Sequence, residues 1–252
     1  MPARKAAAEE EEKRNKIVLN EDADAHVNHH HRNFLNKWWL LSYPRADLVK
    51  KLANSNRYIV CSRVTKRPIF EFVDASIRPN DALQVFGLQD DYSFGVLHSA
   101  AHWAWFRARC STFKADPRYT SNSVFDTFPW PQRPSKLAVR KVAEAAVALR
   151  RLRREQIADS EISLRDMYRT LELPGDNPLR DAHTVLDLAV RQAYGMSLKE
   201  DYLAFLLKLN HEVKAREAKL GLPKGPGLPP EIRNTGDFIT EDRIGEAGYL
   251  VK

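Results

Sequence analysis

The stretch WAWFRARCSTFKADPRYTSNSVFDTFPWPQ, residues 103–132, divides this chain into a β-bearing part and a helical part. Basic residues stand among aromatic ones in its first half, and a polar run follows from Tyr119 to Ser123. The stretch closes on Phe128-Pro129-Trp130-Pro131, and Pro134 comes soon after. These closely spaced prolines predict the end of the region that contains strands, since proline cannot donate to a β-ladder.

Positive charge is concentrated in this stretch and in the residues that follow it. From Trp103 to Arg154 the sequence has 12 Lys and Arg against 3 Asp and Glu, a surplus of nine, whereas the whole chain carries +7. A basic stripe confined to one segment is typical of nucleic-acid-binding proteins. A solvated basic helix beside a packed loop would give the same count, so charge alone leaves both interpretations open.

Upstream of the stretch, the pattern changes from helical to extended. Amphipathic spacing predicts a helix over His26–Leu41, and a short helix follows over Arg45–Ala53. Three segments rich in β-branched and aromatic residues predict strands, at Arg57–Val64, Pro68–Asp74 and Ala82–Phe86. We expect Ser93 to cap a single helix that runs to about Cys110.

Downstream, the pattern is helical. Apolar residues at heptad-like spacing predict a long helix from Ser135 to about Ile157. Asn177 before Pro178 marks the start of a helix that should stop at Gly195, and another should span Lys199–Lys219. The long helix has a second, basic face, which could contact a DNA backbone or a partner domain: Arg140, Lys141, Arg150, Arg151, Arg153 and Arg154.

These patterns predict an α+β protein in which a small mixed β unit with one helix is flanked and followed by a helical bundle. The expected divisions are a charged tail or solvated helix (1–25), N-terminal connector helices (26–54), the mixed unit (55–134), a C-terminal helical region (135–220) and an irregular Gly/Pro-rich tail (221–252).

Several kinds of site lack support in the sequence. His26 and His30 have a spacing that could share a metal ion, but no HExxH motif or nearby cysteine accompanies them, so no metal site is expected. Cys61 and Cys110 stand in apolar settings and are expected to be reduced thiols, with a disulfide between them as the alternative. No apolar run is long enough to span a membrane and no signal peptide is recognisable, which favours a cytoplasmic protein.

Several long segments, in the same order, resemble the target-recognition region of MmeI-like enzymes, the type IIL restriction–modification proteins and their class I S-adenosylmethionine-dependent DNA methyltransferase relatives. The resemblance runs from about Val27 to Pro229. It includes NRYIVCSRVTKRPIFEFVDASIRPNDALQVF, DDYSFGVLHSAAHWAWF, KADPRYTSNSVFDTFPWPQ, DAHTVLDLAVRQAYGM and KGPGLPP. In that family a methyltransferase domain, often with a nuclease domain, precedes this region. The N-terminal tail would then correspond to the helical connector that follows the catalytic domain.

The resemblance implies that residues 55–134 are a target-recognition unit for double-stranded DNA. They would serve an adenine-N6 methyltransferase, as a domain or a separate subunit, in a restriction–modification or phage-defence system. Basic side chains can neutralise phosphates, whereas Arg, Asn and Ser can read base edges. The aromatic residues Trp103, Trp105, Phe128 and Trp130 are expected in the core. The candidate DNA-binding residues are Arg63, Lys66, Arg67, Arg107, Arg109, Lys114, Arg118, Tyr119, Ser121 and Asn122.

The motifs of methyl transfer are missing from the sequence. Gly225-Pro226-Gly227 has no strand before it, and Asn177-Pro178-Leu179 has leucine where the adenine-N6 motif needs a second proline. No catalytic or cofactor-binding residue is therefore expected, and S-adenosylmethionine belongs to the complete enzyme. Two alternatives stay open: the chain is a subunit of a split, active methyltransferase, or it is a truncated remnant or helical interaction module without a DNA function.

We expect the purified chain neither to bind S-adenosylmethionine nor to transfer its methyl group, because the glycine-rich loop and the catalytic motif are absent from its sequence. Isothermal titration calorimetry with the cofactor checks this expectation. Stoichiometric binding at micromolar affinity would contradict it.

Overall fold

The computed structural model describes residues 2–35, 37, 45–113, 116–160, 162–220, 225–246 and 248–250. The chain forms two compact units, residues 1–50 and residues 51–252. The described residues combine helices with a small sheet, which confirms the α+β class.

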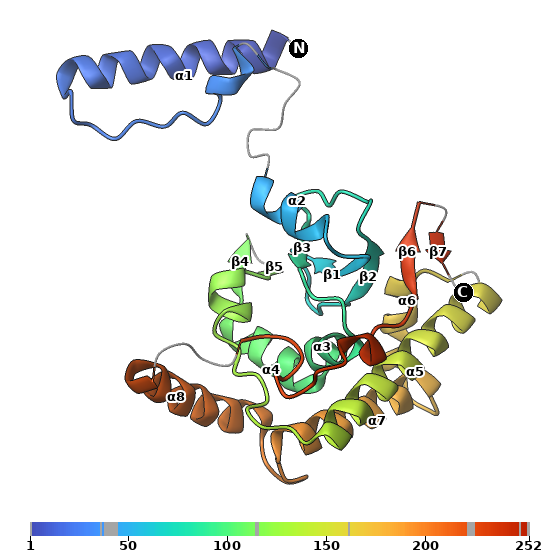
Figure 1. Cartoon of the computed structure of the whole chain (residues 1–252). Coiled ribbons are helices and arrows are strands. Elements are labelled where there is room, and N and C mark those ends of the chain that lie inside the picture. Colours follow the sequence, from blue (N-terminus) through green and yellow to red (C-terminus); the bar gives the residue numbers. More distant parts are fainter. Residues whose placement is uncertain are drawn as a thin grey trace. The chain divides into compact units, whose positions relative to one another are not determined.

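The first unit is built on helix α1 (Pro2–Glu21), against which the following segment folds back (Figure 1). Glu11 accepts the backbone N–H of His31 at 2.7 Å, and Asn15 donates its side-chain amide to the carbonyl of Asn28. The prediction of a helix over His26–Leu41 is wrong for the residues of that segment that the structure describes. They contain only the 3₁₀ turn η1 (Arg32–Phe34). The reason is local: the Asn28 side chain accepts the N–H of His30, which offers the backbone an alternative to helix.

Some residues of that expected helix, Trp38 and Trp39 among them, lie outside the described residues. The short helix α2 (Ala46–Leu52) follows, as predicted, at the boundary between the two units.

The main sheet of the second unit joins strands from both ends of that unit. β1 (Arg57–Ser62) pairs antiparallel with β2 (Glu71–Asp74) and with β3 (Leu83–Phe86), which confirms the predicted strands. Within the described residues the strand order is β3-β1-β2-β6-β7. In Figure 1, β6 accordingly stands beside β2, although their sequences are far apart.

The expectation of an irregular tail over 221–252 is wrong for its second half. The 3₁₀ turn η4 (Thr235–Phe238) is followed by β6 (Arg243–Gly245) and β7 (Gly248–Leu250). Ile244 pairs in parallel with Val73, and the ring of Phe238 is buried. A sheet edge can order a glycine-containing segment because it supplies backbone partners that the segment's own sequence does not reveal.

The single helix expected from Ser93 to Cys110 is in fact two helices, α3 (Asp91–His98) and α4 (Ala100–Arg109). The cap of α3 is Asp90, whose carboxylate accepts the N–H of Ser93 at 2.7 Å. Ser99 adopts an extended conformation between the helices, and its hydroxyl accepts from the first turn of α4. Serine competes for backbone hydrogen bonds in this way, which explains the break.

After α4, the hairpin strands β4 (Ser111–Phe113) and β5 (Asp116–Arg118) lead to a π-helical turn, η2 (Ser121–Phe125). The helical region then comprises α5 (Lys136–Ser160), α6 (Leu164–Arg169), the 3₁₀ turn η3 (Thr170–Glu172), α7 (Pro178–Tyr194) and α8 (Tyr202–Leu220).

Helix α5 packs against both α3 and α7, and the three lie together below the sheet in Figure 1. The predicted ends of α7 are confirmed: Asn177 caps it by accepting from the N–H groups of Leu179 and Arg180, and Gly195 stops it with φ +68°. Crossing a lipid bilayer would need more length and apolar character than any helix in the described part of the chain has.

Arginines that the sequence placed on a basic face of α5 are partly inside the protein, which corrects that expectation. Arg150 and Arg153 are fully buried, whereas Arg151 is exposed. Arg153 pairs with Glu71 and donates to the carbonyl of Phe70 at 3.1 Å. The apolar repeat alone could not show that these two positions face α3 and the sheet.

Arg150 belongs to a buried ion cluster, which we call the arginine–aspartate cluster and define as Arg57, Arg150, Arg154, Asp91 and Asp242. Asp91 accepts from Arg57 at 2.8 Å and from Arg150 at 2.5 Å. Asp242 accepts from Arg150 at 2.7 Å and from Arg154 at 2.5 Å. Burial alone would raise the pKa of the Asp242 carboxyl, but these hydrogen bonds hold it well below its usual range.

Replacing Asp242 with asparagine should lower the free energy of unfolding by about 3–5 kcal/mol, because it leaves buried arginines without their counter-charge. Urea denaturation measures the change. Glu241→Gln is the matched control: that neighbouring carboxylate is 65% exposed and pairs with Arg243 at the surface, so its loss should cost less than about 1 kcal/mol. Equal losses for the two variants would contradict a structural role for the cluster.

Candidate nucleic-acid interface

Backbone pairing brings two of the predicted clusters together. The residues after β1 lie against β5: the N–H of Tyr119 donates to the carbonyl of Arg63 at 2.7 Å, and the N–H of Thr65 donates to that of Pro117 at 2.9 Å. An isolated bridge also joins Val64 to Arg118. The turn that carries Arg63 and Lys66 therefore neighbours the segment that carries Arg118, Ser121 and Asn122. We call these five residues the polar face.

The side chains of the polar face differ in exposure. Lys66, Ser121 and Asn122 are exposed, whereas Arg63 and Arg118 are half-buried. Arg63 donates to the carbonyl of Asp81 at 3.2 Å, which fixes its guanidinium beside the turn before β3. An exposed amide and hydroxyl next to guanidinium groups provide the donors and acceptors that base edges and phosphates need.

Gln84 is a neighbour of the polar face that sequence reasoning missed. It lies on β3, half-buried, and its amide donates to the hydroxyl of Ser121 at 3.0 Å. Among the described strands β3 forms one edge of the main sheet, so one side of its backbone is not paired with a further strand. The alternation of the segment Leu83–Phe86 could have indicated an outward glutamine, but not that it meets Ser121.

Tyr119 is a predicted contact residue that the structure contradicts. Its side chain is 0% exposed, its ring stacks on Phe106 with centroids 5.6 Å apart, and its hydroxyl lies 2.9 Å from Nε2 of His102. Burial raises the pKa of the phenol well above its usual value. Successive side chains of an extended segment point to opposite sides, so Tyr119 points inward where Arg118 points outward. Its role is to anchor the polar face to α4.

The remaining basic candidates are distributed around α4. Arg107 and Arg109 are exposed at its last turn, and their guanidinium carbons lie 5.6 Å from the centroid of the Trp103 ring and 5.4 Å from that of the Trp105 ring. Arg67 is half-buried, and its guanidinium carbon lies 4.8 Å from the centroid of the Trp103 ring. Lys114 lies outside the described residues. Trp105, Phe128 and Trp130 are buried, as predicted, whereas Trp103 is half-buried.

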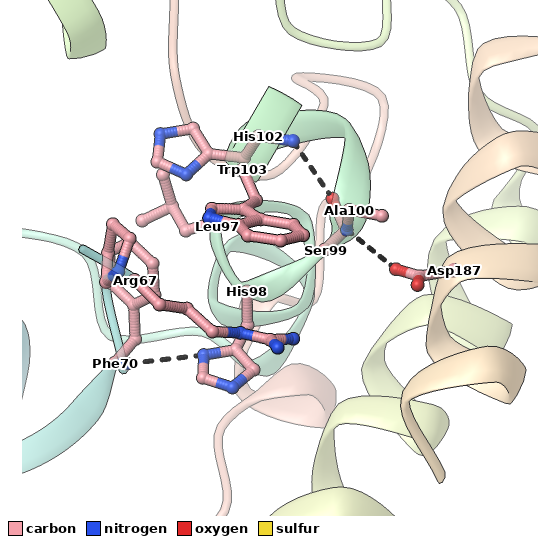
Figure 2. Close-up of a pocket in the computed structure, with 10 residues that line it drawn as sticks. Arg67, Phe70, Leu97, His98, Ser99, Ala100, His102, Trp103 and Asp187 are labelled. Carbon is pink, nitrogen blue, oxygen red and sulfur yellow. Dashed lines mark hydrogen bonds between the residues drawn. The ribbon is translucent and has the colours of Figure 1, made fainter. Parts of the chain in front are cut away.

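A cavity of about 110 Å³ lies beside Arg67 and Trp103 (Figure 2). Asp187, from α7, lines the cavity and accepts the N–H of Ala100 at 2.7 Å, which ties α7 to the start of α4. Burial raises the pKa of the Asp187 carboxyl to about 6, although the nearby arginines favour its charged form. Nε1 of Trp103 is buried and has no hydrogen-bond partner among the described residues.

Buried histidines lie next to this cavity. Nδ1 of His98 accepts the N–H of Phe70 at 3.3 Å, so its Nε2 carries a proton and donates to the hydroxyl of Tyr168 at 2.6 Å. That hydroxyl can in turn donate to Nε2 of His183 at 3.0 Å. Burial lowers the pKa of His98 well below its usual value and that of His102 and His183 to about 3. All three rings are therefore neutral structural groups near pH 7.

The described residues contain no group of three His, Cys, Asp or Glu side chains placed to hold a metal ion. Cys61 and Cys110 are free thiols, and burial raises the pKa of Cys61. The Cys61 side chain is part of the core beneath the sheet, which gives it a packing role.

Much of the chain is similar to known proteins. Residues 50–132 match the family model described as "MmeI, target recognition domain". The fold is similar to that of the type IIL restriction–modification enzyme MmeI, solved in complex with DNA, with a TM-score of 0.63 and 22% sequence identity. The similarity covers 79% of this chain but 26% of that enzyme, so the chain spans about a quarter of its length. No curated protein matches the chain.

Stability should fall as the pH drops from about 6.5 towards 3. The folded chain keeps His98, His102 and His183 neutral, whereas the unfolded chain binds a proton at each, so acid favours unfolding. Each histidine contributes up to about 1.4 kcal/mol per pH unit in this window, and the contribution is fully present above it. Urea denaturation at several pH values measures the slope.

His183→Gln should flatten that slope, since the amide can still accept from Tyr168 but does not titrate. The same substitution at His211, which is exposed on α8, is the control. An unchanged slope in His183→Gln would show that this histidine does not couple folding to pH.

Proposed function

We propose that the chain recognises a specific sequence in double-stranded DNA for a restriction–modification enzyme, since residues 50–132 match the MmeI target recognition domain. The observation that carries the proposal is the polar face. Within the matched segment, pairing of the turn after β1 with β5 gathers cationic and amide side chains on one surface.

Two kinds of contact follow from the chemistry of the polar face. Arg118 can donate two parallel hydrogen bonds to guanine, and Asn122 can pair with the N6 and N7 positions of adenine. Lys66 is a flexible point charge that suits a phosphate but does not distinguish bases. We therefore assign sequence reading to Arg118 and Asn122, and backbone anchoring to Lys66 and Arg63.

The solved MmeI enzyme is much longer than this chain, which supports a role as one part of a larger assembly. We propose that the chain serves an adenine-N6 methyltransferase, as a domain or as a subunit, and that S-adenosylmethionine binds elsewhere in the complete enzyme. A restriction–modification or phage-defence system in the cytoplasm is the setting that this function fits. Co-purification with a methyltransferase chain would support the subunit arrangement.

Arg118→Ala and Asn122→Ala should each relax or change the preference at one base pair. Each should cost about 1–3 kcal/mol on the preferred site and little on non-specific DNA. Lys66→Ala and Arg151→Ala test anchoring instead. If these residues touch DNA, both variants should bind all sequences more weakly by the same factor. The slope of log affinity against log salt concentration should also become shallower by about 0.9 for each phosphate that is no longer neutralised. Binding selection on a randomised duplex library, followed by salt titration of selected sites, measures both effects.

If the Arg118 and Asn122 variants keep the parental site and bind every duplex more weakly by the same factor, these residues anchor the backbone, and the readers lie elsewhere. Absence of a mobility shift by the parental chain at low salt would overturn DNA recognition itself.

A further inference from the structure

Two arginines that come from different parts of the chain lie near the ring of Trp103. The guanidinium carbon of Arg67, from the turn between β1 and β2, is 4.8 Å from the centroid of the Trp103 ring, and that of Arg107, one helical turn along α4, is 5.6 Å from it. Figure 2 shows the Arg67 guanidinium between Trp103 and His98, and all three residues line the cavity. Stacking on an indole holds a guanidinium in place while its N–H groups stay free to donate.

Neither arginine has a carboxylate partner at ion-pairing distance in the described part of the chain, in contrast to the buried arginines of the arginine–aspartate cluster. Arg67 is half-buried, and burial lowers its pKa, so its charge lies in a partly desolvated place where an anion would be attracted strongly. The indole N–H of Trp103 is a further buried donor without a partner. Arg67 and Trp103, which carry these donors, both line the cavity, whereas Arg107 does not.

We propose that Arg67 and Trp103 form a binding site for one phosphate group of the DNA backbone, beside the polar face. This inference rests on the proposed function. The hydrogen bond from Thr65 to Pro117 places the turn that carries Lys66 and Arg67 against β5, so a duplex on the polar face has its backbone within reach of this turn. The site would fix the register of the duplex, whereas Arg118 and Asn122 read its bases.

Asp187 provides a separate test of the phosphate site, because it lines the same cavity and carries a charge of the opposite sign to that of Arg67. One of its oxygens accepts from Ala100, but the carboxylate still repels a phosphate. Asp187→Asn keeps an acceptor for Ala100 and removes the repulsion. Binding of a phosphate predicts that this variant gains affinity, whereas a purely structural role for Asp187 predicts no gain.

Four variants of the full chain test the site by fluorescence anisotropy with a selected duplex and a scrambled one. Arg67→Gln should weaken the binding of both duplexes alike, by about five- to tenfold at low salt. The slope of log affinity against log salt concentration should become shallower by about 0.9. Trp103→Phe, which keeps a ring and removes the N–H donor, should weaken both about threefold. Asp187→Asn should strengthen the binding of both duplexes about two- to threefold. Arg169→Gln, which removes an exposed charge on α6, is the control for net charge and should change neither by more than a small factor.

Thermal unfolding identifies variants that fail to fold, and the gain expected for Asp187→Asn cannot come from misfolding. If the parental chain binds DNA but Arg67→Gln and Asp187→Asn bind as it does, the phosphate site is wrong and the proposed function stands. A loss confined to the selected duplex would make Arg67 a base reader, which also overturns the phosphate site. If the parental chain does not bind DNA, both proposals fall.

Discussion

The arginine–aspartate cluster is the interaction on which the rest of the second unit depends. It joins the first residue of β1, the first residue of α3, the middle of α5 and the C-terminal segment before β6 through two shared carboxylates. A buried charge is tolerated only when its partners are in place, so these four elements have to be positioned together. The cluster sits over aromatic rings as well: the guanidinium carbon of Arg57 is 3.6 Å from the centroid of Phe72.

The cluster acts on the candidate interface through the helices that extend from it. Asp91 fixes the start of α3, Ser99 turns the chain into α4, and α4 ends at the hairpin that bears Arg118. From the other side, Asp187 on α7 accepts from the first turn of α4. The polar face is thus presented by a helix pair that is held at its beginning and middle, which suits the placement of short side chains against a rigid ligand.

Local signals in the sequence predicted where helices and strands lie better than they predicted which side chains are buried or paired. The asparagine that caps α7 and the proline that begins it, like the strand segments on either side of Lys66, depend on short-range chemistry, and the structure confirms them. The burial of Arg150 could not be predicted in the same way, because its partners Asp91 and Asp242 lie 59 and 92 residues away. The same limit explains β6: its parallel partner β2 is far upstream, and its own Gly245 indicates a loop. At the candidate site, residue types identified Arg118, Ser121 and Asn122 as polar candidates, but the inward orientation of Tyr119 follows from pairing with Arg63, which sequence spacing does not show.

The inward position of Tyr119 also limits how this surface can diversify. The exposed side chains of Ser121 and Asn122, which follow it, can be exchanged without a cost in core packing, since the tyrosine itself holds the segment against α4. Inserting or deleting one residue within β5 would instead turn the tyrosine outward and a polar neighbour into the core. Substitution at constant length is therefore the accessible evolutionary route to a new preference, and the hairpin length is the quantity expected to stay fixed among descendants of this chain.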